Sequence, residues 1–139
     1  MTRSWKGEGV VAVFLVLVGL FIYGQFPLGA KSFQKGFWHN PVGMASWYSE
    51  EDPGVRERTA NNEVFNDQAL TCAMWDVPFN QKIKVTNLDN GKSVVVRVND
   101  RGPHKRLVRD GRIIDLSKAA FDRIAVLNKG LIHVQLEFL

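Results

Sequence analysis

An uninterrupted apolar stretch lies near the amino terminus. Residues 10–23 contain no charge and follow a start that carries Arg3 and Lys6. A basic start before an apolar stretch of this length is typical of a secretory signal. Extended to Ala30, the stretch approaches the roughly 20 residues of a membrane-spanning helix. Residues 1–30 are therefore predicted to form an apolar helix that is either a cleaved signal peptide or a membrane anchor.

Both alternatives place the rest of the chain outside the cytoplasm, because the positive flank of such a segment stays inside. We expect a periplasmic or other extracytoplasmic location, with attachment to the inner membrane if the segment is not cleaved. No cysteine lies directly after the apolar stretch, where a lipoprotein carries one, so a lipoprotein is not expected. Residues 31–42 show no clear period and are interpreted as a linker.

From residue 43 to residue 139 the pattern changes to short segments of the strand type. Asn90-Gly91 separates two of them and favours a tight hairpin turn, because both positions tolerate positive φ. The last segment alternates apolar and polar residues, as a half-buried strand does. The predicted strands cover residues 44–48, 69–74, 83–88, 93–98, 112–114 and 133–139.

One segment has helical periodicity. Apolar residues fall on one side of residues 118–128, Ser117 is a suitable N-cap, and Gly130 is a suitable stop. Many short strands with one helix predict a mainly β domain, a small closed barrel of residues 43–139.

Composition and charge narrow the function. The chain is 45% hydrophobic and 23% charged, with a formal net charge of +4. A basic balance favours an anionic partner such as a wall polymer or a membrane surface. The basic residues are scattered apart from the run 105–112, which is typical of a solvated loop and could also bind an anionic polymer. Because there is no aromatic–basic alternation, no nucleic-acid partner is expected.

Cysteine and histidine usage excludes other chemistries. Cys72 is the single cysteine, so an internal disulfide is impossible, and a small buried hydrophobe is its expected role. No histidine shows the pairing that a cysteine nucleophile needs. The absence of metal-ligand spacings predicts no metal and no cofactor.

Three carboxylates are candidates for chemistry. Asp100 lies where a strand runs into a Gly-Pro turn; it is either a turn-forming aspartate or a rigidly held acid whose charge Arg101 tunes. Glu63 lies in a polar loop and is either solvated or functional. Asp115 has apolar neighbours and is interpreted as structural. Glycan cleavage commonly uses two carboxylates, one of them protonated near neutral pH.

Aromatic residues offer possible sugar platforms. Trp47, Tyr48 and Trp75 could stack on sugar rings, or they could fill the core of a small barrel.

Several motifs occur in the order of a known family, and the chain resembles the RlpA-like (rare lipoprotein A) proteins over residues 43–139. The N-D-R-G-P and I-D-L-S blocks at this separation are the most specific. The motifs are G-M-A-S-W-Y (43–48), T-A-N-N-E (59–63), L-T-C-A (70–73), P-F (78–79), V-T-N-L (85–88), N-G-K-S (90–93), V-R-V-N-D-R-G-P (96–103) and R-I-I-D-L-S-K-A-A (112–120).

The resemblance implies a six-stranded double-psi β-barrel, shared more distantly with expansins and family-45 cellulases. It implies a peptidoglycan lytic transglycosylase that acts on glycan strands, preferably those stripped of stem peptides, and cuts between N-acetylmuramic acid and N-acetylglucosamine to leave a 1,6-anhydro end. We expect the protein to be a monomer. By position it implies Asp100 as acid/base and Glu63 as its partner. Supporting roles fall to Asp115, Arg101 and Asn99, and substrate contacts to Trp47, Tyr48, Thr59, Asn61 and Met74.

The chain departs from the family pattern in three respects. Met74 stands where the family usually has histidine, and Asn62 stands where it usually has glycine. The lipoprotein cysteine and the carboxy-terminal SPOR repeat of better-known members are missing. Met74 favours the alternative hypothesis, a non-catalytic wall-binding or wall-loosening module of the expansin type.

Overall fold

The computed structural model describes residues 40–139, so the predicted signal or anchor and residues 31–39 of the predicted linker lie outside the described residues. Within residues 40–139, no helix is both long enough and apolar enough to cross a membrane.

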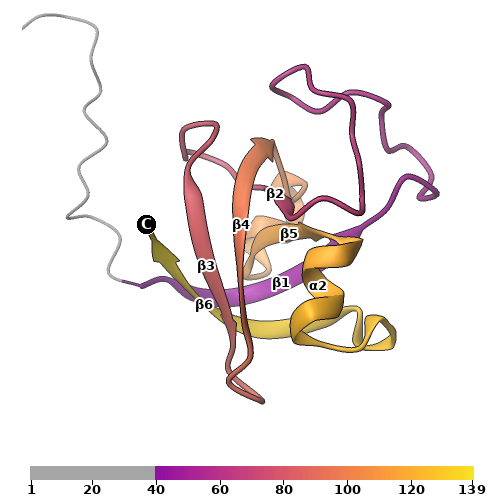
Figure 1. Cartoon of the computed structure of the whole chain (residues 1–139). Helices are drawn as coiled ribbons and strands as arrows, with labels where there is room; N and C mark the ends of the chain where they lie inside the picture. Colours follow the sequence, from indigo (N-terminus) through magenta and orange to yellow (C-terminus); the bar gives the residue numbers. More distant parts are fainter. Residues whose placement is uncertain (1–39) are drawn as a thin grey trace, which may run out of the picture. The chain divides into compact units, whose positions relative to one another are not determined.

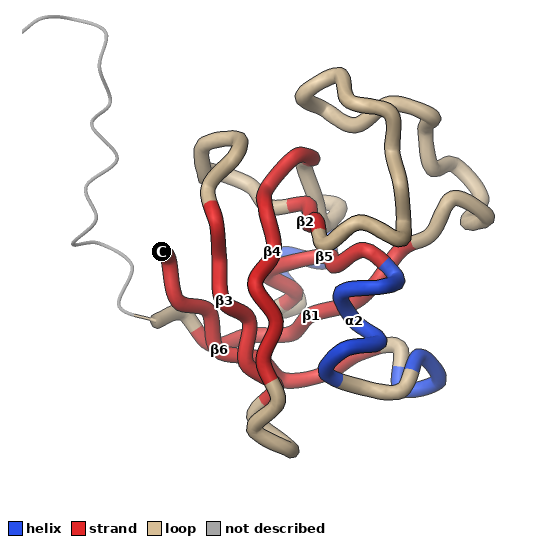
Figure 2. The backbone as a smooth tube through the Cα atoms, viewed as in Figure 1, coloured by secondary structure: helices blue, strands red, loops and turns tan. Residues whose placement is uncertain are grey.

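Six strands close into a barrel, as Figures 1 and 2 show. Around the barrel the order is β1-β5-β2-β4-β3-β6, in which β1 pairs with β5 and β2 with β4 in parallel, while the other four pairs are antiparallel. The predicted mainly β closed barrel is confirmed. The strands are β1 (Val42–Tyr48), β2 (Thr71–Ala73), β3 (Lys82–Asn87), β4 (Ser93–Asp100), β5 (Arg112–Ser117) and β6 (Leu131–Phe138).

The barrel interior is filled by the apolar positions of the alternating strands. In β3, Ile83 and Val85 are fully buried while the lysines beside them face outward. Phe121 of α2 (Lys118–Ile124) is also fully buried, so the helix closes the core on one side. Burial of this kind contributes about 1.5–3 kcal/mol per large apolar side chain.

The helices differ from the prediction in two ways. The segment predicted as one helix over 118–128 is α2 followed by a 3-10 turn, η1 (Leu127–Lys129), because Ala125 adopts an extended backbone between them. The run interpreted as a loop contains a second helix, α1 (Lys105–Arg109), which buries none of its residues. The predicted strand 69–74 is also shorter, since only Thr71–Ala73 pair as β2.

Ser117 joins α2 to the barrel. Its hydroxyl accepts from the Ala120 N–H at 3.4 Å, as an N-cap does, and donates to the Ala69 carbonyl at 2.6 Å. The residue is fully buried. The predicted cap is confirmed, and it also fixes the chain that enters β2.

The Ser117→Ala substitution should lower the free energy of unfolding by about 1–3 kcal/mol, because it removes a cap and a buried hydrogen bond. Urea unfolding of the full chain measures this. Ser93→Ala, at an exposed position at the start of β4, is the matched control and should change stability by less than about 0.5 kcal/mol. Equal losses in the two variants would contradict the role given to Ser117.

Candidate active site

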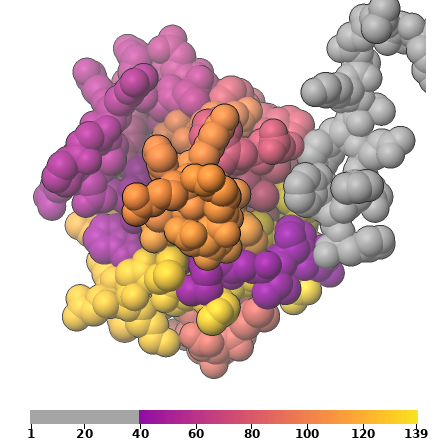
Figure 3. Space-filling view, turned by 180° about the vertical axis from the view of Figure 1, so that it is seen from behind, coloured from indigo at the N-terminus to yellow at the C-terminus, as the bar shows by residue number. Residues whose placement is uncertain are grey.

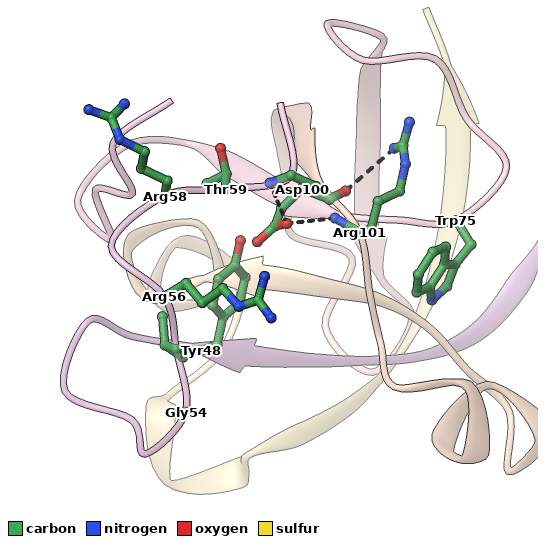
Figure 4. A pocket seen from close by; sticks show the side chains of 10 residues that line it. Tyr48, Gly54, Arg56, Arg58, Thr59, Trp75, Asp100 and Arg101 are labelled. Atoms are coloured by element: carbon green, nitrogen blue, oxygen red, sulfur yellow. Dashed lines mark hydrogen bonds between the residues drawn. The ribbon is translucent and has the colours of Figure 1, made fainter. Parts of the chain in front are cut away.

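A groove of about 500 Å³ runs between the long β1–β2 connection and the end of β4 (Figure 4). Polar and basic side chains line it together with two aromatic rings. The lining residues are Tyr48, Gly54, Val55, Arg56, Arg58, Thr59, Ala60, Trp75, Asp100 and Arg101. The groove is neither an enclosed cavity nor a flat surface, so part of a larger ligand can enter it from solvent.

Asp100 lies at the end of β4 and enters this groove. Its Oδ1 accepts from two backbone N–H groups, those of Ala60 at 2.9 Å and Arg101 at 2.8 Å. No hydrogen bond within the described residues engages Oδ2. One oxygen therefore holds the carboxylate in place, while the other is left for a ligand or a proton.

Tyr48 forms the wall beside Asp100. Its ring stacks on Phe65 with centroids 4.6 Å apart, and in Figure 4 its hydroxyl points toward the Asp100 carboxylate. The hydroxyl is buried and has no hydrogen-bond partner within residues 40–139. Burial, followed by the negative charge of Asp100, raises the pKa of the Tyr48 phenol. The group thus stays protonated, and its O–H donor faces the Asp100 carboxylate.

A row of residues across neighbouring strands lies behind Asp100. Ala73 of β2 pairs with Asp100 on one side and with Asp115 of β5 on the other, and Ser46 of β1 pairs with Asp115. The Ser46 hydroxyl donates to Asp115 Oδ1. Burial raises the pKa of Asp115, and Asp100 adds to the rise. The two aspartates are therefore electrostatically coupled across one alanine.

Gly102 keeps this row close-packed. A Cβ at Gly102 would lie 3.1 Å from the Ala73 Cβ and 3.3 Å from Asp115 Oδ2. Such contacts are tighter than most that real Cβ atoms make. The glycine of the N-D-R-G-P block thus lets the turn after Asp100 pass next to Asp115.

Glu63 occupies a different environment and does not line the groove. Arg97 grips its carboxylate with two nitrogens at 2.7 and 2.8 Å, and Asn61 and Asn99 donate at 2.8 and 3.2 Å. These hydrogen bonds lower the pKa of Glu63 to about 2, those from Arg97 most of all. Glu63 is thus a permanent anion at neutral pH, and its predicted action on substrate stays a prediction.

The other predicted contact residues divide between groove and core. Thr59 and Arg101 line the groove; Arg101 lies 3.7 Å above the Phe79 ring and donates to the Met74 carbonyl. Trp47 instead donates to the Leu127 carbonyl at 3.1 Å and packs against the core. Met74 is 5% exposed, so its side chain belongs to the core.

Some groove residues were missed by the sequence analysis. These residues are Gly54, Val55, Arg56 and Arg58, which belong to none of the motifs above. The two arginines, with Glu57 between them, lie just before T-A-N-N-E, and this position was a usable signal. Arg58 donates to the Asn62 carbonyl at 2.9 Å, and its guanidinium points away from Asp100 in Figure 4. Cys72 is fully buried, as expected, and burial raises the pKa of its thiol. Within residues 40–139, no three His, Cys, Asp or Glu side chains gather as metal ligands.

The barrel and this groove define the class of protein. The model of the lytic transglycolase family matches residues 40–136, and the chain belongs to that family.

Curated relatives agree. The chain is 50% identical over 96 residues to the probable endolytic peptidoglycan transglycosylase RlpA of Synechocystis sp., covering 68% of this chain and 28% of the relative. It is 46% identical over 118 residues to the endolytic peptidoglycan transglycosylase RlpA of Vibrio cholerae, covering 81% of this chain and 42% of the relative. The chain thus spans less than half the length of either protein.

Among solved structures, an expansin from Clavibacter michiganensis superposes with a TM-score of 0.55 at 19% identity. The match covers 72% of this chain and 50% of the expansin. At this identity the likeness supports the barrel fold alone.

The pH dependence of stability tests the Glu63 ion pair. The folded pKa of about 2 lies below the ordinary value of about 4.3, so Glu63 stabilises the fold above pH 4.3 and loses that contribution as the pH falls toward 2. At pH 7 the urea midpoint of unfolding should therefore be higher for wild type than for Glu63→Gln. The difference between the two midpoints should decrease steadily as the pH falls.

Glu137→Gln is the matched control for this pair. Its carboxylate pairs with Lys84 at 3.6 Å and is more exposed than that of Glu63. We expect little pH-dependent difference from wild type. A gap for Glu63→Gln that stays constant from pH 7 to pH 2.5 would show that the charge of Glu63 is not what stabilises the loop.

Proposed function

We propose that this chain is a peptidoglycan lytic transglycosylase. It would cut glycan strands between N-acetylmuramic acid and N-acetylglucosamine, acting as a monomer on strands free of stem peptides. The observation that carries the proposal is the Asp100 carboxylate, fixed through Oδ1 by two backbone N–H groups in an open groove. Family membership and the names of the relatives support it.

The reaction needs one group that acts twice. Asp100, protonated, donates its proton to the bridging oxygen as the bond from that oxygen to muramic C1 breaks. The resulting carboxylate then accepts the proton of the muramic C6 hydroxyl, whose oxygen bonds to C1 and closes the 1,6-anhydro ring. Atoms balance without water, and Asp100 returns to its protonated form.

Other groove residues take supporting parts in this proposal. The protonated Tyr48 hydroxyl offers a donor beside Asp100, and Arg56 and Arg101 give the groove a positive lining for a strand that carries carboxylates. Asp115 lies behind Asp100, and Glu63 holds the 59–63 loop through Arg97.

The proposal also includes a double-psi topology for the barrel and export of the barrel from the cytoplasm. The closed barrel with two parallel pairs is compatible with the double-psi topology. The apolar segment 10–23 supports export, with the barrel on the extracytoplasmic side of the membrane.

A second function, a wall-binding module without catalysis, is favoured by one observation. Met74 replaces the histidine of the family pattern and is buried in the core, so this position supplies no titratable group to the groove. Tyr48 and Trp75 would still offer aromatic surface to a glycan.

The Asp100→Asn substitution separates these functions. The amide oxygen can keep both backbone hydrogen bonds, so the fold should persist, while loss of the acid should lower the yield of 1,6-anhydro ends by about 10²–10⁴-fold. Mass spectrometry of digested, peptide-free glycan strands measures the yield.

Asp122→Asn, at an exposed position of α2, is the matched control and should cleave like wild type. An unchanged yield with Asp100→Asn would remove Asp100 from the mechanism. Intact strands with wild type, together with co-sedimentation on insoluble cell wall, would favour the binding module.

A further inference from the structure

A second hollow adjoins the groove. It has a volume of about 260 Å³ and is lined by Trp75, Asp76, Lys105 and Val108. Trp75 lines the groove as well, so one side chain borders both spaces. In Figure 4, Trp75 lies at the other end of the groove from Tyr48, with Arg101 between them. The hollow is smaller than most pockets that bind a whole ligand. It can hold one part of a ligand that continues into the groove.

The Trp75 ring is fixed in place. Its Nε1 donates to the Pro103 carbonyl at 2.6 Å, and the side chain is half-buried. A held indole offers a flat apolar surface at little entropic cost. The apolar face of a sugar ring complements such a surface, and the Asp76 carboxylate beside it can accept hydrogen bonds from sugar hydroxyls.

Lys105 brings a positive charge to the same hollow. Its Nζ lies 5.5 Å from the centre of the Trp75 ring, and it forms no ion pair within the described part of the chain. It begins α1, where Arg106 and Arg109 add two further charges and no residue is buried. Figure 3 shows the orange segment that contains α1 at the front of the molecule. Because α1 does not pack into the core, its surface is free for a ligand.

We propose that Trp75, Asp76, Lys105 and Val108 form a second sugar-binding subsite that takes a further residue of the strand held in the groove. The sugar stacks on Trp75, and its free carboxylate, the lactyl group of an N-acetylmuramic acid without peptide, pairs with Lys105. The ligand must therefore carry an apolar ring face and a carboxylate on the same sugar. This proposal rests on the proposed function for the identity of the strand, but it concerns binding rather than cleavage.

Binding to the full chain tests the subsite. The probes are a peptide-free oligosaccharide of alternating N-acetylglucosamine and N-acetylmuramic acid, and a chito-oligosaccharide of equal length without carboxylates. Calorimetry in the Asp100→Asn background keeps the first probe intact. Trp75→Ala should raise the Kd for both probes about tenfold, and Trp75→Phe, which keeps a ring, by less.

We expect the protein with Lys105 to bind the carboxylate-bearing probe more tightly than the chito-oligosaccharide. Lys105→Gln should raise the Kd for the carboxylate-bearing probe alone, by about two- to fivefold, and so abolish this difference in affinity. Lys92→Gln, in the exposed turn before β4, is the matched control and should retain both affinities. Thermal unfolding of each variant confirms that it is folded.

The outcomes separate this proposal from the proposed function. Unchanged affinities in folded Trp75→Ala and Lys105→Gln overturn the subsite, even where wild type cleaves strands. If the variants lose affinity as expected but wild type cleaves no strands, the subsite is supported and the enzymatic function is overturned. Wild type that binds neither probe overturns the subsite, and cleavage assays of wild type then decide the enzymatic function separately.

Discussion

The site depends on the attachment of the 59–63 loop to the end of β4. Asp100 Oδ1 accepts from the Ala60 N–H, the Asn61 N–H bonds to the Asn99 carbonyl at 3.2 Å, and Arg97 grips Glu63 with two hydrogen bonds. Charge-assisted hydrogen bonds of this kind are stronger than neutral ones. The same set of hydrogen bonds fixes the 59–63 loop, which forms one wall of the groove, and orients the Asp100 carboxylate. A movement of the loop would therefore also change the orientation of Asp100.

The two acidic residues that resemble a catalytic pair in the sequence are separated by this attachment. Asp100 faces the groove, whereas Glu63 is used as the anion that anchors the loop. The carboxylate nearest to Asp100 in strand register is instead Asp115, one alanine away across β2. The parallel pairs β1–β5 and β2–β4 bring these positions together although they are far apart along the chain.

Local signals in the sequence were sufficient for much of the barrel. Alternation predicted β3 and β6, and Asn-Gly predicted the turn in which Gly91 has a φ of 72°. The helix α1 was missed because its basic run carries no apolar stripe and packs on no core. The Arg97–Glu63 pair joins residues 34 positions apart in the sequence. A contact over this separation cannot be predicted from patterns within one short segment.

One part of the site was predictable and was overlooked. Trp47 and Tyr48 are neighbours on β1, and successive side chains of a strand point to opposite faces. Both rings could therefore not face one groove: Trp47 packs against the core beside Leu127, while Tyr48 borders Asp100.

The most direct measurement is a digest of peptide-free glycan strands by the full chain in water labelled with oxygen-18, followed by mass spectrometry of the new ends. Ring closure by the C6 hydroxyl predicts anhydro ends that carry no label, because water takes no part in the bond cleavage. Reducing ends that carry the label would mean that water attacks C1, and would contradict the account of Asp100 as acid and base of a transglycosylase.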